Sequence, residues 1–486
     1  MKRNKKIGIL LAMFVCVSLA AFGVVRYEEK KEMIKNSDEI ILEVAAETVK
    51  TLSWECDTGA YAFYRDESGS WRYEADEAFP VDGEKIENLL EQFHEFGVSF
   101  VIEEVEDWGQ YGLDTPVCTI HMETEENSYE ICLGDYSAMD SERYISIGDG
   151  NAYLVKNDPL DSFAIEISDV IQHDEIPKLS DVTQLRFAGA ESAQVVYEEN
   201  SANSYYAEDV YYLKQEDAYL PLDTVNVNDY LNTIRNLNLK EYATYNASED
   251  ELVSCGLDEP MLSVSIDYTV ANEETGEEKT ETFVLHIGRD SAEQQQDAGA
   301  EADNSENMLE STKTEEQVTA YARVGESKII YQITSEQYQK LMDMSYNTLR
   351  HQEMFWGDFD DMYRLDITLE DADYTITSEQ KDGQRIYYYR DEEVEMAGIR
   401  STIRDLTAQS FTDETPVQKE EISLTLYLDN ENYPKVQIQL YRYDGNNCIA
   451  VVDGEPVAFV ERTSVVDLIE AVNGIILDCT ASVPVR

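Results

Sequence analysis

The sequence predicts an α+β protein in which three tandem repeat units, each an antiparallel sheet with packed helices, follow one N-terminal transmembrane helix. Three observations support this prediction: an uncharged N-terminal stretch, three amphipathic helical patterns, and runs of alternating apolar and polar residues. A chain of 486 residues has room for about three domains. The predicted segments are a cytoplasmic basic tail at 1–6, the anchor at 7–25, a stalk at 26–46, and repeat units at 47–177, 178–350 and 351–486.

The N-terminal stretch sets the predicted localisation. Residues 7–25 carry no charge, and 19 residues just suffice to cross a hydrocarbon core of about 30 Å. Four basic residues precede the stretch and should stay in the cytoplasm, so the chain after Arg26 is expected to be extracytoplasmic. One alternative is a signal peptide cleaved after Ser18-Leu19-Ala20, although the apolar stretch is longer than is usual for such peptides. A lipoprotein anchored at Cys16 is disfavoured because Val15 stands where a small residue is expected.

The charge of the chain disfavours nucleic acid as a partner. There are 37 Lys and Arg against 100 Asp and Glu, a net charge of −63, whereas binding to phosphate backbones requires clustered basic residues. The chain is nevertheless expected to fold, because 43% of its residues are hydrophobic and 10% are aromatic. Weak, diffuse binding of divalent cations is expected from so acidic a surface, but the sequence has no EF-hand loop.

Each predicted unit begins with an amphipathic helix and continues with strands. The helices are expected at 82–96, where Asp82 is placed to cap the start, at 228–239 and at 395–409. A helix at 335–344 closes the second unit and one at 464–472 closes the third. The strands are expected at 118–122, 129–133, 143–147 and 152–155, at 262–268, 282–287, 320–324 and 329–333, and at 423–428, 436–441, 448–452 and 457–460. Residues 291–317, with eight acidic residues and one Lys, are predicted to be a disordered insertion.

A second pattern occurs twice. Tyr111-Gly112-Leu113-Asp114-Thr115-Pro116 recurs 144 residues later as Cys255-Gly256-Leu257-Asp258-Glu259-Pro260. We interpret both as helix stops: Gly112 and Gly256 adopt the left-handed conformation, Leu113 and Leu257 pack back onto Trp108 and Leu252, and Pro116 and Pro260 prevent continuation. The alternative is a ligand loop that presents Asp114 or Asp258. The third unit lacks the pattern.

The cysteines leave two alternatives open. Cys118 and Cys132 would face each other across a predicted hairpin and form a disulfide, whereas the favoured interpretation is that the cysteines outside the predicted anchor are free thiols that serve as small apolar residues. These cysteines are Cys56, Cys118, Cys132, Cys255, Cys448 and Cys479.

A search for catalytic motifs finds no catalytic residue, cofactor site or metal site. The five histidines occur singly, without HExxH spacing, and neither a GxSxG elbow nor a phosphate-binding loop is present. Ser378 and Lys381 match the SxxK spacing, but they lie beside an expected hairpin turn, and the KTG strand is missing from the sequence. An enzyme is therefore disfavoured.

Several motifs in fixed order resemble one bacterial family. They are Ser70-Trp71-Arg72-Tyr73, the Tyr-Gly-Leu-Asp-x-Pro pattern, Ile131-Cys132-Leu133-Gly134, and a Tyr-Ile-x-Ile strand that starts at Tyr144. In this order they resemble the family known as domain of unknown function 4340, over roughly residues 47–345. The resemblance implies a membrane-anchored exported protein associated with ABC-type transport, and it implies no catalytic residue.

Together these observations predict a non-enzymatic accessory protein, scaffold or ligand-binding component of a membrane transport complex. The expected partners are the membrane, through the single-pass anchor, and another protein of that complex. One alternative is an extracellular hydrolase or cell-wall enzyme whose site is assembled from distant residues, which would show a cleft with converging carboxylates. Another is a calcium-dependent adhesive or glycan-binding protein.

Overall fold

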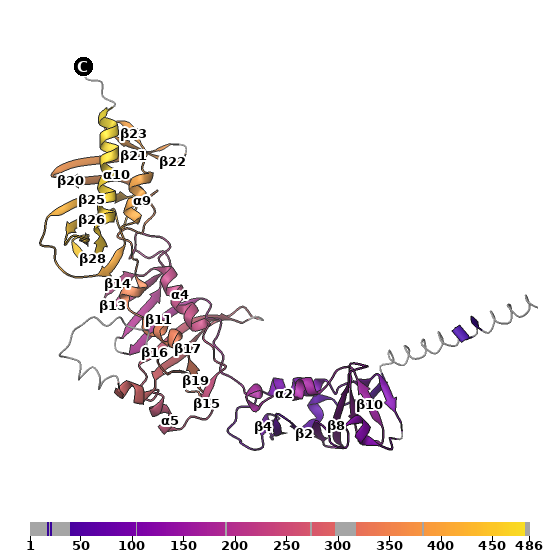
Figure 1. The fold of residues 1–486 in the computed structure, drawn as a ribbon. Coiled ribbons are helices and arrows are strands. Elements are labelled where there is room, and N and C mark those ends of the chain that lie inside the picture. Colours follow the sequence, from indigo (N-terminus) through magenta and orange to yellow (C-terminus); the bar gives the residue numbers. More distant parts are fainter. Residues whose placement is uncertain are drawn as a thin grey trace, which may run out of the picture. The chain divides into compact units, whose positions relative to one another are not determined.

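The fold consists of two compact units, Met1–Asp174 and Glu175–Arg486, in a computed structural model of the chain. The structure describes residues 17–18, 20–21, 39–103, 105–189, 192–272, 275–296, 317–381 and 383–481. Figure 1 shows each unit as layers of strands with helices laid on them. The two units are described one at a time below.

The predicted α+β class is wrong, because the fold is mostly β. Strands account for 42% of the residues and helices for 21%, and the strands form four antiparallel sheets, not three α+β repeats. One cause is that expected helices are shorter than their apolar patterns. The helix predicted at 395–409 is α9 (Ala397–Arg404), and β24 (Ala408–Phe411) follows it. A second cause is that strands of three residues, such as β15 (Tyr242–Thr244), are too short to show an alternating pattern.

The predicted single-pass anchor is also corrected. Among the residues that the structure describes, no helix combines the length and the apolar character needed to cross a bilayer. The longest described helix, α10 (Arg462–Ala481), is interrupted by charged residues such as Asp467 and Glu470. The stretch at 7–25, on which the anchor and the membrane localisation rested, lies outside the described residues except for four positions.

The first unit contains a two-stranded sheet, β1-β5, and an eight-stranded sheet, here called sheet I, with the order β4-β3-β2-β7-β8-β9-β10-β6. Helix α2 starts as the sequence predicts, since the Asp82 carboxylate accepts hydrogen bonds from the amides of Glu84 and Lys85 at 3.1 and 3.2 Å. The elements are β1 (Glu39–Leu42), η1 (Ala46–Thr48), β2 (Val49–Cys56), β3 (Gly59–Arg65), β4 (Trp71–Tyr73), α2 (Gly83–Glu91), β5 (Phe96–Val98), β6 (Phe100–Ile102), η2 (Trp108–Tyr111), β7 (Cys118–Thr124), β8 (Ser128–Ser137), β9 (Glu142–Ser146), β10 (Ala152–Val155), α3 (Leu160–Phe163) and η3 (Ile167–Val170).

The second unit begins with a nine-stranded sheet, here called sheet II, with the order β14-β13-β12-β11-β16-β17-β18-β19-β15. The helix expected at 228–239 starts earlier, as α4, because Asp223 caps it. The elements are β11 (Val182–Gly189), β12 (Ala193–Tyr197), β13 (Tyr211–Gln215), β14 (Ala218–Pro221), α4 (Thr224–Arg235), β15, α5 (Glu249–Ser254), β16 (Leu262–Ala271), β17 (Glu278–Arg289), β18 (Ala320–Val324), β19 (Ile330–Ile333), α7 (Ser335–Met342) and α8 (Tyr346–Leu349).

A third large sheet, here called sheet III, completes the second unit and has the order β23-β22-β21-β20-β25-β26-β27-β28-β24, which matches sheet II strand for strand. The domain boundary predicted after residue 350 falls inside this compact unit. The elements are β20 (Met362–Leu369), β21 (Ala372–Lys381), β22 (Gln384–Tyr389), β23 (Glu392–Val394), α9, β24, β25 (Glu420–Leu428), β26 (Lys435–Arg442), β27 (Asn447–Val452), β28 (Glu455–Glu461) and α10.

Helices cover one face of sheets II and III. In sheet II, Leu231 and Ile234 of α4 and Leu341 of α7 share a buried cluster with strand residues such as Val264 and Ile266. Along β16, buried residues alternate with half-buried ones, so the opposite face of the sheet is reached by solvent. We call this the open face.

The predicted insertion at 291–317 is helical at its start. Residues 291–296 form a helical turn, and Glu293 accepts hydrogen bonds from the amide and the hydroxyl of Thr319 at 3.0 and 2.7 Å. These bonds tie the turn to the segment that leads into β18. Residues 297–316 lie outside the described part of the chain.

Candidate functional site

The two Gly-Leu-Asp-x-Pro loops close short helices. Gly112 ends η2 with φ +67°, and the Leu113 amide donates to the Trp108 carbonyl at 3.1 Å. Gly256 follows α5 with φ +63°, and the Leu257 amide donates to the Leu252 carbonyl at 2.8 Å. This geometry, with a left-handed glycine and a hydrogen bond back across the last turn, is that of a helix C-cap.

Each loop also lies directly against a glycine of the neighbouring sheet. A Cβ added to Gly134 in β8 would come within 2.2 Å of the Tyr111 carbonyl oxygen. A Cβ added to Gly288 in β17 would come within 2.5 Å of the carbonyl oxygens of Cys255 and Gly256. Real Cβ atoms do not approach so closely, so these backbone contacts require glycine.

The acidic and proline positions of the two loops lie at the surface of their units. Asp114 and Asp258 are exposed, while Pro116 and Pro260 are half-buried. The Asp114 carboxylate accepts from the Thr115 hydroxyl at 3.4 Å. The geometry therefore supports the structural interpretation of the loops rather than the ligand-loop alternative.

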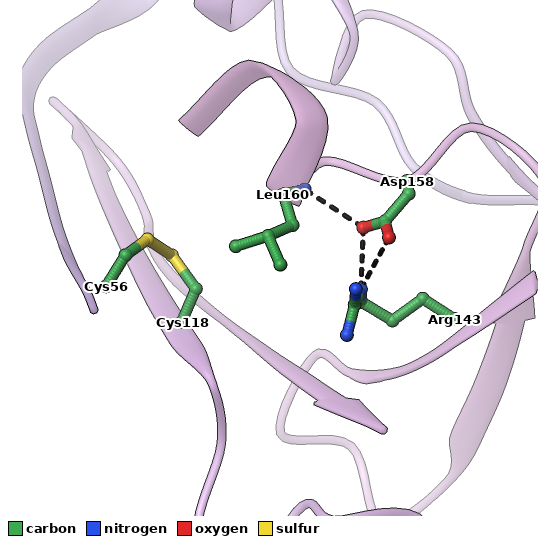
Figure 2. Close-up of a disulfide and its surroundings, with 5 residues drawn as sticks. All are labelled: Cys56, Cys118, Arg143, Asp158 and Leu160. Atoms are coloured by element: carbon green, nitrogen blue, oxygen red, sulfur yellow. Dashed lines mark hydrogen bonds and ion pairs between the residues drawn. A yellow bond between two sulfur atoms is a disulfide. The ribbon is translucent and has the colours of Figure 1, made fainter. Parts of the chain in front are cut away.

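The first unit contains a disulfide that the sequence did not predict. Cys56 and Cys118 face each other on β2 and β7 with their Cα atoms 4.3 Å apart and form the disulfide in Figure 2. The favoured interpretation of free thiols is therefore wrong for Cys56 and Cys118. The alternative pairing of Cys118 with Cys132 is also wrong, because Cys132 lies opposite Thr119 and is free. Cys56 and Cys118 are 62 residues apart, so only the pairing of β2 with β7 brings them together. Disulfides form and persist in oxidising environments.

The free thiols of Cys132, Cys255 and Cys448 agree with the prediction for these three positions. Burial, and then the charge of Glu421, raises the pKa of Cys448 to about 12. Burial is also the main cause that raises the pKa of Cys132 and of Cys255. Because the thiolate is the reactive form, a raised pKa lowers the reactivity of a thiol at neutral pH.

A buried ion pair lies near the disulfide (Figure 2). Nε of Arg143 lies 2.7 and 2.6 Å from the two carboxylate oxygens of Asp158, and Nη1 donates to the Gly134 carbonyl at 2.6 Å. Asp158 also accepts from the Leu160 amide at 3.0 Å and so holds the start of α3. Both charged side chains are 10% exposed. Arg143 holds the irregular part of β8 through the Gly134 carbonyl, and Asp158 holds the start of α3 through the Leu160 amide. Both charged groups are therefore hydrogen-bonded within the protein.

The second unit brings together a serine, an aspartate and a histidine that are far apart in sequence. Asp209 lies between β12 and β13, and His351 lies between α8 and β20. Nε2 of His351 lies 2.8 Å from one carboxylate oxygen of Asp209, and the Ser204 hydroxyl donates to the other at 2.5 Å. The Trp356 indole donates to Asp209 at 3.0 Å, and its ring stacks on His351 with centroids 4.6 Å apart.

This cluster is a structural junction. In a nucleophilic triad the histidine lies between the serine and the aspartate, whereas here Asp209 lies between Ser204 and His351. All three residues are buried, so a substrate does not reach them. Three hydrogen bonds satisfy the Asp209 carboxylate. They connect the loop between β12 and β13 to the segment that precedes β20, the first strand of sheet III. Sequence reasoning missed the cluster because Asp209 and His351 are 142 residues apart.

One serine–histidine pair does reach solvent. On the open face of sheet II, the Ser263 hydroxyl lies 2.8 Å from Nδ1 of His286 on the neighbouring strand. Burial, and then the charge of Arg323, lowers the pKa of His286, so its imidazole is neutral at pH 7. Within the described residues, no carboxylate is hydrogen-bonded to the other ring nitrogen of His286. The pair therefore differs from a nucleophilic triad, in which an acid orients the histidine.

The described part of the chain has surface grooves but no cluster of metal-binding side chains. No group of three His, Cys, Asp or Glu side chains is placed to hold a metal ion among these residues. Grooves are present on the surface, including one of about 700 Å³ between α4 and α7 and one of about 510 Å³ between β22 and α9. Neither groove is lined by residues of the Ser204–Asp209–His351 cluster.

Fold and site together define a mostly-β protein with several sheets whose buried polar groups hold the structure together. Residues 71–260 match the family described as "Domain of unknown function (DUF4340)". The matched region begins at β4 and ends at Pro260, so it contains both Gly-Leu-Asp-x-Pro loops and is narrower than the region expected from the motifs. No curated protein and no solved structure matches the chain.

Proposed function

We propose that this protein is a non-enzymatic scaffold that binds a protein partner on the open faces of its sheets. The observation that carries the proposal is the one-sided covering of sheets II and III. Their helices and buried clusters lie on one face, while the other face presents a flat row of hydroxyl, amide and charged side chains. Flat faces of this kind suit a macromolecular partner better than a small substrate.

The polar groups of the open faces are arranged in rigid sets. In sheet II, Arg186 binds Asp267 with two hydrogen bonds of 2.5 and 2.8 Å, and the Thr282 hydroxyl donates to Asp267 at 2.7 Å. In sheet III, Arg364 binds Asp366 at 2.8 and 2.6 Å, and Thr375 donates to Asp366 at 2.8 Å. Preorganised side chains lose little entropy when a partner binds.

The net charge of −63 favours a partner with a basic surface. The disulfide supports a role under oxidising conditions. The accessory role beside an ABC-type transport system, which the family resemblance implies, is the setting that we propose for the partner.

The partner is tested by affinity capture. The full chain, kept oxidised and incubated with an extract of its source cells without cross-linking, should retain a basic protein at 0.15 M salt and lose it at 1 M, because screening shortens electrostatic reach from about 8 to 3 Å. Thr282→Arg and Thr375→Arg, which place a bulky cation on each open face, should reduce recovery at least fivefold. Gln339→Arg on α7, which lies on the covered side, is the matched control. Recovery of the chain alone, or equal recovery by all three variants, contradicts the proposal.

The absence of hydrolase chemistry is tested separately with a fluorophosphonate probe, which labels activated serines. We expect no labelling of the folded chain at Ser263, because no carboxylate among the described residues orients its pair with His286. Labelling that disappears in both Ser263→Ala and His286→Ala would establish an enzyme instead.

A further inference from the structure

The largest of the surface grooves described above is lined mainly by residues that carry polar groups. It has a volume of about 700 Å³ and lies between α4 and α7, and Thr348 and Leu349 of α8 also line it. Its size is within the range of small-molecule sites, about 300–1,000 Å³, but such sites are usually lined by apolar side chains. Here amide, hydroxyl and carboxylate side chains form most of the lining; among them are Asn226, Asp229, Asn232, Thr233, Asn236 and Gln337.

Spacing on the helices places these side chains on one face. On α4, Asn226, Asp229 and Thr233 follow each other at intervals of three and four residues, which is the repeat of one helical face. Asn232 and Asn236 extend the same side towards the C-terminus of α4. The buried residues Leu231 and Ile234 belong to the opposite side, which packs on sheet II.

Several of these side chains have hydrogen-bonding capacity that the protein does not use. Among the described residues, the carboxylates of Asp229 and Asp343 have no hydrogen-bond or ion-pair partner. The Oδ1 atom of Asn232 accepts from Arg235 at 2.8 Å, which leaves its Nδ2 group unused. The Nδ2 group of Asn236 donates to the Asn232 carbonyl at 2.8 Å, which leaves its Oδ1 atom unused. Donors and acceptors therefore alternate along the groove.

The chemistry of the lining selects the class of ligand. One Lys and three acidic residues line the groove, which repels anions, and the scarcity of apolar side chains gives little affinity for an apolar molecule. A hydroxyl group both donates and accepts a hydrogen bond, as an amide does, and a carboxylate accepts two hydroxyl groups at once. We propose that the groove between α4 and α7 binds a neutral polyhydroxylated ligand, that is, a glycan. This site is separate from the open faces and goes beyond the scaffold role.

In sheet III the helices in the corresponding places are α9 and α10, and their residues Ile403, Leu468 and Val472 belong to one buried cluster. The outward residues of α9 and α10 differ from those of α4 and α7. The groove of sheet II is therefore a property of its helix sequences and does not follow from the strand order that the two sheets share.

The proposal is tested by isothermal titration calorimetry of the full chain with four neutral hexasaccharides: cellohexaose, laminarihexaose, maltohexaose and mannohexaose. We expect at least one to bind with a Kd of 1 mM or tighter and to be weakened at least tenfold by Asp229→Ala and by Asn232→Ala. Both side chains are exposed, so the melting temperature of each variant should equal that of the native chain. Gln339→Ala, an exposed amide on α7 outside the groove, is the matched control and should bind normally. Lack of binding by all four sugars, or binding that Asp229→Ala and Asn232→Ala leave unchanged, overturns the proposal.

Discussion

Sheets II and III have the same strand order but differ at two equivalent places. In sheet II the last residue of β11 pairs with Leu262, which pairs with Ile287, and in sheet III the last residue of β20 pairs with Ile422, which pairs with Leu440. The residue after Ile287 is Gly288, which lies against the Gly-Leu-Asp-x-Pro loop. The residue after Leu440 is Tyr441, and sheet III lacks the loop motif. The second difference is the outward side of the helix pair: a groove with many polar side chains lies between α4 and α7 in sheet II, whereas α9 and α10 of sheet III carry other outward residues.

These differences show that strand order and surface chemistry are set by different residues. Strand order depends on the alternating buried positions, which both sheets retain. The loop contact depends on one glycine that allows two backbones to touch, and the groove depends on the outward side of two helices. The same strand order therefore accommodates a different loop contact and different outward helix residues.

The largest expected effect is on the buried cluster of sheet III. Leu468→Ala removes a fully buried side chain between α10 and the sheet and should lower the free energy of unfolding by about 2–5 kcal/mol. Asn232→Ala in the groove of sheet II should change it by less than about 0.5 kcal/mol. Urea unfolding with hydrogen-exchange mass spectrometry assigns each change to its sheet. Equal losses in the two variants would contradict this difference between a buried and an exposed position.

The loop contact of sheet II is the next test. Gly288→Ala places a Cβ within 2.5 Å of two carbonyl oxygens and should destabilise the fold by about 1–3 kcal/mol. Gly445→Ala in sheet III is the control, because a Cβ there has no heavy atom within 4 Å. Thermal unfolding of the two variants gives the comparison. A neutral Gly288→Ala would show that the loop does not lie against β17.

The buried junction tests whether sheets II and III unfold together. Asp209→Asn replaces an oxygen that accepts hydrogen bonds by an amide that donates, and it should cost about 1–3 kcal/mol. It should also separate the unfolding of the two sheets, because the Asn side chain keeps one accepting oxygen and cannot accept from Ser204, His351 and Trp356 together. Hydrogen exchange measured on peptides of each sheet reports this separation. Unchanged cooperativity would place the coupling elsewhere.

The smallest effect concerns the open faces, where the two sheets agree. The hydrogen bonds of Arg186 are the main cause that lowers the pKa of Asp267. A carboxyl group whose pKa is lowered by folding stabilises the native state above the pKa of the unfolded chain, about 3.9, and this contribution is lost as the pH falls below about 4. Arg186→Met should therefore cost less than about 1 kcal/mol at pH 7, and its stability should converge with that of the native chain near pH 3.

The same measurement on Arg364→Met in sheet III should give a curve of the same form, since Arg364 holds Asp366 in the same way. Urea midpoints between pH 3 and pH 7 provide both curves. A stability difference that grows as the pH falls would contradict the assigned role of these ion pairs.

Local features could be predicted from the sequence alone. Asp82 caps α2 as predicted, because a cap involves only residues a few positions apart. Ser248 and Glu251 form a capping box at the start of α5 by the same kind of local contact. Most long strands also lie within a few residues of their predicted places, since alternation is visible within a single segment. The helix ends after Gly112 and Gly256 have the geometry expected of their local sequence.

Only the tertiary structure decided the fold class, the disulfide, the buried junction and the groove. Cys56 meets Cys118, and Asp209 meets His351, across distances in sequence that no local pattern spans. The short strands that complete the sheets, such as β15, are held by pairing with a distant strand and not by their own alternation. The groove between α4 and α7 exists because two helices, each unremarkable alone, are laid side by side on one sheet. Local hydrogen bonds and the alternation of apolar and polar residues depend on residues a few positions apart, whereas contacts between distant segments depend on how the whole chain packs.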